Sequence, residues 1–469
     1  MNAPMLLRAL TTLTTLAIVP LLAGCAQSAR QVAPPMPELP TQWRAADTSS
    51  VVSEPKSQGD PTRSDRIQWW QAFGDASLDA LIEEALAKNA DLADAAILVR
   101  RARIEAGLVG ARLGPQASMG ISADAARDLD TGHAGVRSGV NGTVSYELDL
   151  WGKLAARRDE AAWRAHASEA DREAAALALI GATAKLYWRI GHLNEVMALG
   201  QAAIVDAERI VSIAEARLAA GASSSLDVVE ARQQLAQVRA DVLLWQQQRE
   251  AKRNALALLL GTAPESRRAE PIDLSSSVVP KVPPRAPALM LAHRPDVRAA
   301  EWRLRAQLAR IDFSRASLYP SFTLTGEFGT SSDMLVRAVQ NPVASIGAAI
   351  ALPFLQWNTL QLNTALANVD FERASVDFRR VLYRALADVE DALVVKAQLD
   401  SAASIRWQAA SDAAMASALV RTRYENGAID IAPLLDARRG ERKAQLDRAA
   451  NRLARLENRM DLFLALGGA

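Results

Sequence analysis

The stretch at residues 423–437, RYENGAIDIAPLLDA, sets the organisation of the chain because a closely similar stretch precedes it. Residues 217–231 read RLAAGASSSLDVVEA, which aligns Gly221 with Gly427 at an offset of 206 residues and without a gap. Each stretch has the pattern of a helix, a glycine that breaks it, and a second helix. We therefore predict two helical hairpins with their tips near residues 221 and 427.

The same alignment extends far beyond the tips, at offsets of 205 or 206 residues. The further matched pairs are Asp91 with Asp296, Trp151 with Trp357, and Leu260-Gly261 with Leu466-Gly467. A period of about 200 residues exceeds the roughly 20 to 50 residues of solenoid and propeller repeats. We therefore predict a first structural repeat at 67–261, a Pro-rich crossover linker at 262–288 and a second structural repeat at 289–469.

The overall composition argues against several classes of function. The chain has 469 residues with 54 basic and 53 acidic side chains, so it lacks the excess of basic residues typical of nucleic-acid binding. Its four histidines, at positions 133, 166, 192 and 293, have no neighbours at metal-ligand spacing. No nucleophile elbow, phosphate-binding glycine loop or framed carboxylate pair is found in the sequence. We expect no nucleic-acid partner, no metal, no non-covalent cofactor and no enzymatic activity.

The N-terminus has the features of a lipoprotein signal peptide. Residues 1–24 carry Arg8, an apolar run and small residues before Cys25, as in a secretory signal. Cys25 is the only cysteine, so no disulfide forms within the chain. Residues 22–25, LAGC, resemble the bacterial lipobox, which implies cleavage before Cys25 and its modification by S-diacylglycerol and an N-acyl group such as palmitate. Ala26 at the next position implies transport to the outer membrane.

An ordinary signal peptide with a chance cysteine is the alternative to this interpretation. Residues 25–66 are rich in Pro, Ser, Gln and Asp and show no apolar period. We expect them to form an extended N-terminal arm, lipidated at Cys25 if the lipobox is used.

Four segments alternate apolar and polar residues with a period of two. They lie at about 116–126, 138–148, 321–331 and 343–353. Runs of about ten alternating residues with aromatic ends are typical of outer-membrane barrel strands. Tyr319, Trp151 and Trp357 are candidates for the aromatic belts of such a barrel. The alternative is a pair of half-buried hairpins in a soluble protein.

Four strands are too few to close a membrane barrel. The smallest membrane barrels have about eight strands, and open sheet edges are not tolerated in lipid. If the strands span a membrane, several chains must combine them, and three chains supply twelve.

A very long helical segment follows each strand pair, at about 154–220 and 359–426. Heptads in the returning segments, from Val228 to Trp245 and from Leu446 to Phe463, predict antiparallel coiled coils. Isolated amphipathic helices in a bundle are the alternative. The fold class predicted is mainly α with transmembrane β, built as a duplicated protomer.

Taken together, these motifs resemble the TolC/OprM outer-membrane channels of tripartite export pumps, in the NodT-like efflux lipoprotein branch. The resemblance covers nearly all of the mature chain. It rests on the lipobox, the segment WWQAFGD at 69–75, the segment ALAKNADL at 85–92, the helix end at Gly114-Pro115 and the doubled tips. In that family, three protomers form a twelve-stranded β-barrel that is continued by a long α-helical barrel in the periplasm.

The resemblance also implies function and partners. It implies a homotrimer in the outer membrane of a Gram-negative bacterium, in contact with outer-membrane lipid. The channel would be the passive exit duct of a tripartite efflux pump, such as one that confers multidrug resistance. Substrates would come from an inner-membrane transporter of the RND type through a periplasmic adaptor, the membrane fusion protein, which meets the tips.

By the same resemblance, residue roles can be transferred to both tips. The adaptor-contacting positions fall on Arg217, Gly221, Leu226, Arg423, Gly427 and Leu434, and the periplasmic constriction falls on Ala432, Asp436 and Arg439. Ala432 and Pro433 replace bulkier or acidic residues of relatives, which predicts a weaker apolar constriction. Alternatively, Asp436 and Arg439 form a solvated ion pair on one helix, and the tip glycines are simple helix breaks.

Two questions stay open at this point. The chain alone does not decide between drug or metal efflux and an outer-membrane role in a type I protein secretion system. A periplasmic coiled-coil adaptor or structural lipoprotein is a further alternative, which the four alternating strands oppose.

Overall fold

The structure is a computed structural model that describes Trp43 and residues 68–127, 129–265, 268–281, 292–332 and 342–468. The predicted signal peptide and the lipid-attachment residue Cys25 lie outside the described residues. So does the predicted N-terminal arm apart from Trp43. The described chain divides into two compact units, one of which comprises Pro115–Arg157 and Leu308–Phe371.

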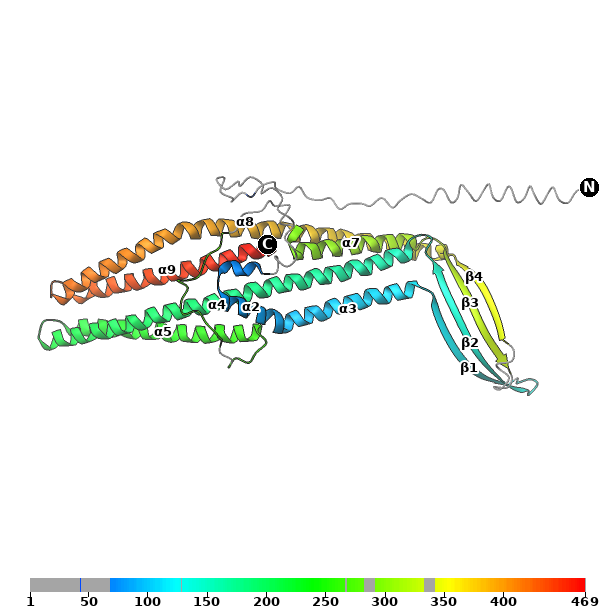
Figure 1. The fold of residues 1–469 in the computed structure, drawn as a ribbon, viewed down its shortest axis with the longest axis horizontal. Coiled ribbons are helices and arrows are strands. Elements are labelled where there is room, and N and C mark those ends of the chain that lie inside the picture. The colour runs from blue at the N-terminus through cyan, green and yellow to red at the C-terminus, as the bar shows by residue number, and fades with distance from the viewer. Residues whose placement is uncertain are drawn as a thin grey trace, which may run out of the picture. The chain divides into compact units, whose positions relative to one another are not determined.

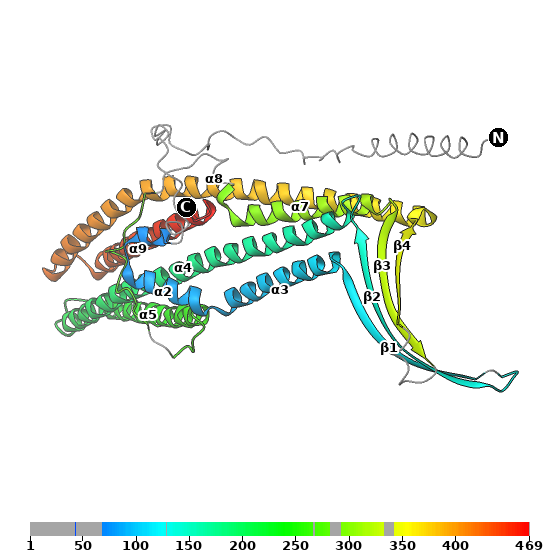
Figure 2. The ribbon, with the colours of Figure 1, turned by 45° about the vertical axis from the view of Figure 1, so that its right-hand side comes forward.

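That unit contains a four-stranded antiparallel sheet (Figure 2). Its strands are β1 (Gln116–Arg127), β2 (Ala134–Leu148), β3 (Ser321–Ser332) and β4 (Pro342–Ala351), in the spatial order β1-β2-β3-β4. The two repeats meet where β2 pairs with β3. Among the described strands, β1 and β4 are therefore the edges of the sheet, each paired with a strand on one side only.

The register of the sheet places apolar residues beside apolar residues in continuous rows. One row contains Ala117, Val144, Gly326 and Ile346. The next row, on the opposite face, contains Ser118, Thr143, Glu327 and Ser345, and there the Ser118 Oγ and Thr143 Oγ1 atoms lie 2.6 Å apart. Ile346 is 95% exposed in the single chain, so the apolar face of the sheet is uncovered.

Aromatic side chains gather at one end of the sheet. The rings of Trp151 and Tyr319 stack with their centres 5.1 Å apart, and Trp151 Nε1 donates to the carbonyl oxygen of Pro320. Trp357, at the start of α8, is half exposed. These are the three residues that the sequence marks as candidates for an aromatic belt.

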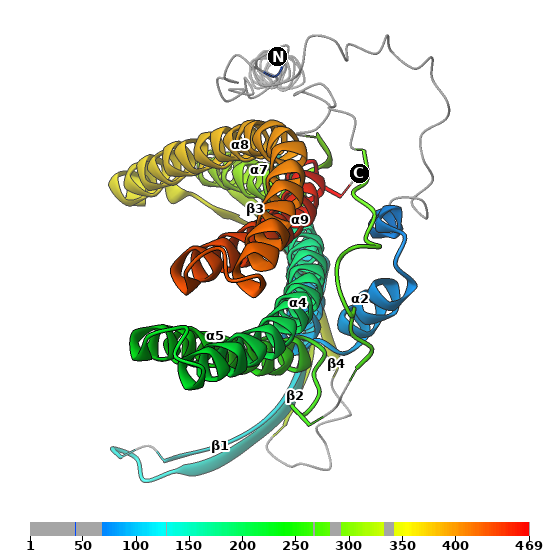
Figure 3. The same ribbon diagram turned by 90° about the vertical axis from the view of Figure 1, so that its left-hand side faces the viewer.

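The second unit is helical. It contains α2 (Ala76–Lys88), α3 (Ala90–Leu113), most of α4 (Lys153–Ala219), α5 (Ser225–Leu259), much of α7 (Pro295–Ala316), most of α8 (Trp357–Glu425) and α9 (Ile431–Ala465). Two 3-10 turns, η2 (Trp69–Phe73) and η4 (Pro353–Gln356), precede α2 and α8. α4 and α8 have 67 and 69 residues, so each spans about 100 Å. Within this unit α5 returns beside α4, and α9 beside α8 (Figures 1 and 3).

These long helices are amphipathic rather than uniformly apolar. No described helix has a stretch both long and apolar enough to cross a membrane. The returning helices α5 and α9 bury the heptad positions, such as Val228, Val238 and Leu456, against the outgoing helices. The predicted fold class, mainly α with four strands in a duplicated protomer, is confirmed.

The start of the helical unit is fixed by its aromatic segment. Trp69 stacks on Phe463 of α9 with ring centres 5.0 Å apart, and Phe73 lies 4.9 Å from Trp188 of α4. Asp75 caps α2 and accepts a hydrogen bond from the hydroxyl of Tyr187. Burial, together with that hydrogen bond, raises the pKa of Tyr187. The segment therefore ties the first turn of the unit to both hairpins.

Candidate functional site

The two hairpin tips have the same backbone geometry. Gly221 and Gly427 adopt φ values of 69° and 77°, which L side chains rarely reach. In each tip the glycine N–H and the next N–H bond back to carbonyls of the last helical turn, at Leu218 and Arg217 in one tip and at Tyr424 and Arg423 in the other. Each bond satisfies a carbonyl that the helix end leaves without a partner. The glycines therefore define both turns.

Below the turns, one apolar cluster joins the two hairpins. Its buried members are Ile210, Ala214, Val228, Ala231, Tyr424, Ile431, Leu434 and Leu435. They come from all four helices of the hairpins, so the two tips pack as one body within the helical unit. Leu434, predicted as an adaptor contact, is only 1% exposed. That assignment is wrong for the single chain, because this face of α9 packs inward against the other hairpin.

Arg217 of α4 makes the main polar link between the tips. Its guanidinium carbon lies 4.1 Å from the centre of the Tyr424 ring. Its Nη2 also donates to the carbonyl oxygens of Tyr424 and Glu425 at the end of α8. Arg209 of α4 and Glu425 of α8 add an ion pair at 3.5 Å. Arg217 thus adds a hydrogen-bond donor from one hairpin to the last carbonyls of the outgoing helix of the other.

Tyr424 is central to the tips, although the sequence analysis assigned it no role. The side chain is 1% exposed, and its hydroxyl has no hydrogen-bond partner among the described residues. Burial raises its pKa, which the charge of Arg217 partly opposes. The duplication aligns Tyr424 with Leu218. This aromatic residue in place of an aliphatic one was the sequence feature that could have pointed to a special role for Tyr424.

An open polar cleft lies between α5 and α9, just behind the tips. Its volume is about 350 Å³, and it is lined by Glu230, Gln233, Gln234 and Gln237 of α5 and by Ala432, Leu435, Asp436 and Arg439 of α9. All three residues of the predicted constriction therefore line one surface. Neutral amides and charged groups dominate this surface, as expected for a wet passage rather than an apolar plug.

Within the chain, Asp436 and Arg439 form an ion pair. Arg439 Nη1 lies 3.0 Å from Asp436 Oδ1, and the side chains are 60% and 72% exposed for Arg439 and Asp436, respectively. An exposed pair of this kind contributes little to the stability of one chain. Its high exposure leaves both groups available to neighbours or to ions.

The remaining predicted tip positions lie at the surface. Leu226 is 61% exposed, and Arg423, Gly221 and Gly427 are exposed. Arg217 is only partly accessible because it contacts Tyr424.

Arg438, the neighbour of Arg439 in the sequence, is not a free surface residue. It pairs with Asp206 at 2.9 Å and with Glu441 at 3.0 Å. Arg438 therefore holds α9 to α4, and nothing in the run of two arginines indicated which one faces inward.

The described residues include no group of three or more His, Cys, Asp or Glu side chains that could hold a metal ion.

Comparison with known proteins gives two matches to one family model. The model described as outer membrane efflux protein matches residues 81–262 and again residues 286–468. The starts of these two matches differ by the offset of the internal duplication. Each repeat therefore corresponds to one unit of the family model, and the two together cover most of the chain.

Individual relatives match over most of their length. The pyoverdine export outer membrane protein OpmQ of Pseudomonas putida is 30% identical over 92% of each chain. Toxin and drug export protein A of Aggregatibacter actinomycetemcomitans is 31% identical over 69% of this chain and 71% of its own. The open-state structure of the Neisseria gonorrhoeae MtrE outer membrane channel superimposes with a TM-score of 0.83, at 28% identity over 94% of this chain and 98% of that one.

Proposed function

From the premise that this chain belongs to the outer membrane efflux protein family, we propose that three copies assemble into one duct that spans the outer membrane and the periplasm. The chain is an outer-membrane channel of a Gram-negative efflux pump, and its family consists of transport channels rather than enzymes. The observation that carries the proposal is the sheet. It has an uncovered, continuous apolar face and two unpaired edges.

Closure of the sheet requires further copies. In lipid, every backbone N–H and C=O needs a protein partner, so β1 and β4 cannot remain edges. Pairing β4 of one copy with β1 of the next satisfies both edges with the same interface. Three copies give a twelve-stranded barrel with its apolar face toward lipid. The helical wall of the duct is formed in each copy by α3, α4, α7 and α8, with the returning α5 and α9.

This barrel can be tested by disulfide trapping, because β2 and β3 separate β1 from β4 within one chain by about 14 Å. In a Cys25→Ser background, Ser118→Cys on β1 is combined in turn with Ala344→Cys, Ser345→Cys and Ile346→Cys on β4. At least one pair should yield covalent trimers under oxidation. The control, Thr143→Cys on β2 with Ser345→Cys, should stay monomeric. Monomers from all three β1–β4 pairs would refute closure between copies.

The tips are the proposed docking site for a periplasmic adaptor. Among the predicted adaptor contacts, Leu226 and Arg423 have side chains that stay exposed where the two hairpins pack together. The adaptor would connect the duct to an inner-membrane transporter of the RND type, which supplies the energy while the duct stays passive. Leu226→Asp and Arg423→Glu should abolish adaptor cross-linking and drug resistance without loss of trimer.

Cys25 is the proposed lipid-attachment site. It has no possible disulfide partner in the chain and follows a lipobox-like sequence. Cys25→Ser should abolish palmitate incorporation, while part of the export function survives because the barrel still holds the protein in the membrane. Unchanged palmitate incorporation in the variant would show that Cys25 is not the lipid-attachment site.

Protein export is a second candidate function. The relative named toxin and drug export protein A favours it, since one duct can serve more than one transporter. A deletion strain should show increased drug sensitivity if the chain serves efflux. Loss of a secreted protein with unchanged drug sensitivity would instead favour a type I secretion system.

A further inference from the structure

A groove of about 370 Å³ lies on the first hairpin, close to its tip. Its lining comes from α4 and α5 and includes Leu218, Ser225, Val228, Val229 and Arg232. Val229 is 60% exposed, and the side chain of Arg232 is 63% exposed. This surface is therefore open in the single chain.

The internal duplication identifies the equivalent surface on the second hairpin. At an offset of 206 residues, the five lining residues correspond in order to Tyr424, Ile431, Leu434, Leu435 and Arg438. The first four are buried members of the apolar cluster between the hairpins, which also contains Ile210 and Ala214 of α4. Arg438 pairs with Asp206 of α4 at 2.9 Å. On the second hairpin, α4 of the first hairpin therefore covers this surface.

The helix that corresponds to α4 in the duplication is α8. Within the helical unit, α5 and α8 lie at opposite edges of the layer of helices, with α4 and α9 between them (Figures 1 and 3). Two helices thus separate α8 from the groove of its own chain. In the proposed trimer, the α8 edge of one copy faces the α5 edge of the next.

α8 exposes the side chains that such a contact requires. Leu419 is 62% exposed, although its counterpart Ile213 packs against the apolar cluster between the hairpins. Asp412, the counterpart of Asp206, is exposed and accepts a hydrogen bond from Gln408 at 2.9 Å. No cation forms an ion pair with Asp412 among the described residues. Its carboxylate is therefore available to a neighbouring copy.

The ion pairs between α4 and α9 show which contact the seam between copies can repeat. In the described part of the chain, these pairs are Arg438–Asp206, Lys185–Asp461, Arg189–Glu457 and Arg452–Glu195. The counterparts of the last three are Asp391 with Ala255, Val395 with Ala251, and Gln246 with Ser401, none of which can form an ion pair. Arg232 and Asp412, the counterparts of Arg438 and Asp206, retain both charges.

We propose that α8 of one copy occupies the groove on the first hairpin of the next copy, where Asp412 pairs with Arg232. The inference rests on the proposed trimer and adds to it a specific contact in the helical unit. Leu419 and Val229 meet at the same seam, as Ile213 and Leu435 do between the hairpins of one chain. The covered pair is screened by salt less than an exposed pair.

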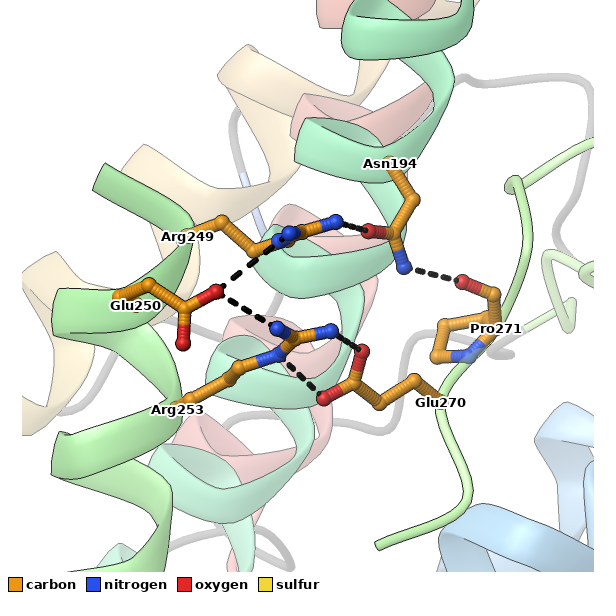
Figure 4. Close-up of polar contacts among 6 residues, drawn as sticks. All are labelled: Asn194, Arg249, Glu250, Arg253, Glu270 and Pro271. Carbon is orange, nitrogen blue, oxygen red and sulfur yellow. Dashed lines mark hydrogen bonds and ion pairs between the residues drawn. The ribbon is translucent and has the colours of Figure 1, made fainter. Parts of the chain in front are cut away.

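The other end of α5 supplies a control, because its charges are paired within the chain (Figure 4). Arg253 binds both carboxylate oxygens of Glu270 in the linker, at 2.6 and 2.5 Å, and donates to Glu250 at 2.6 Å. Arg253 lies about 30 Å from Arg232 along the same helix. A change at Arg253 is therefore independent of Asp412.

The first test joins the two positions chemically in the full-length protein in detergent. In a Cys25→Ser background, Arg232→Cys is combined with Asp412→Cys and treated with a short bismaleimide reagent that links two thiols. We expect covalent dimers and trimers. The matched control combines Arg438→Cys with Asp206→Cys, which are the same positions in the contact within one chain. This control should react but stay monomeric.

The result is compared with the β1–β4 disulfides, which test the trimer by itself. Covalent trimers from β1–β4 together with monomers from Arg232→Cys/Asp412→Cys would overturn the seam contact and leave the trimer in place. Monomers from both experiments would remove the proposed trimer and the seam contact with it.

The second test measures the ion pair through the temperature at which the trimer dissociates into monomers. Arg232→Gln and Asp412→Asn should each lower this temperature, and the double variant should lose less than the sum of the two. Arg253→Gln combined with Asp412→Asn should be additive, because these side chains are not in contact. Additive losses for Arg232→Gln and Asp412→Asn would overturn the ion pair.

Discussion

The first and second repeats hold the same backbone turns with different side chains. The root of each hairpin is the end of its returning helix, away from the tip. At the root of the first hairpin, Asn89 caps α3 and donates to the carbonyl oxygen of Leu259 in α5 at 2.9 Å. At the matched place in the second repeat, Arg294 donates to the carbonyl oxygen of Ala465 at 3.1 Å and pairs with Asp296 and Asp388. A neutral amide in one repeat thus corresponds in the other to a buried arginine paired with two partly exposed carboxylates.

The tips differ in the same way. Arg217 of the first tip binds the second tip of its own chain, whereas the matched Arg423 is exposed. The two tips therefore keep the same glycine turn, while their side-chain partners have diverged. In the proposed trimer, we therefore expect most of the contacts between the two hairpins of one chain to differ from the contacts between neighbouring chains.

The largest effect is expected at Arg294. Its side chain is 9% exposed, so Arg294→Met leaves Asp296 and Asp388 without their shared partner and Ala465 without a donor. We expect a loss of about 2 to 3 kcal/mol for Arg294→Met, the upper part of the range for hydrogen bonds to charged groups, against about 1 kcal/mol for Asn89→Ala. Denaturant unfolding of the trimer in detergent measures both. Equal losses would show that the two roots are energetically alike despite their different chemistry.

Arg217 should come next. Arg217→Met removes the contact with the Tyr424 ring and the bonds to two carbonyls, which together contribute about 1 to 2 kcal/mol. Arg423→Met is the matched control and should change little in the single chain. We expect a higher channel conductance in planar bilayers for Arg217→Met, because the tips are less firmly joined. An equal rise in Arg423→Met would mean that the seam between chains is as important as the contact within one.

A pH effect distinguishes the repeats at another matched position. Burial lowers the pKa of His192 in α4, whereas the second repeat has Gln398, which does not titrate. Below about pH 6.5, the pKa of an unfolded histidine, His192 binds a proton more readily in the unfolded chain than in the folded chain. The stability that the buried, neutral His192 contributes is therefore present above that pH and lost as the pH falls. His192→Gln should reduce the loss of the unfolding midpoint between neutral pH and pH 5. An unchanged pH profile would assign the acid sensitivity to other groups.

The smallest effect on stability is expected at Asp436 and Arg439, which are exposed and contribute only a few tenths of a kcal/mol within one chain. Their effect on transport should nevertheless be measurable, because the three copies of the proposed trimer would bring three Asp436 carboxylates together at the axis. We expect Asp436→Ala and Arg439→Ala to raise single-channel conductance, less than additively in the double variant. Asp436→Ala should also lower cation selectivity. Unchanged conductance and selectivity in both variants would make the pair a simple surface contact.

Local patterns in the sequence determined most of the architecture. Alternation with a period of two located four strands, heptads located the returning helices, and Gly221 and Gly427 located the tips, because each feature depends on residues close together in the chain. The constant offset between repeats exposed the duplication. The lipobox-like sequence determined the expectation of a lipid anchor at Cys25, which the described residues do not reach.

Only the tertiary structure decided which side chains meet. Leu434 lies in the core between the hairpins, and Tyr424 contacts Arg217 of the other hairpin. Arg438 pairs with a neighbouring helix, whereas Arg439 stays exposed. These pairings join residues tens or hundreds of positions apart. They depend on the rotation and stagger of packed helices, which a local sequence pattern leaves open.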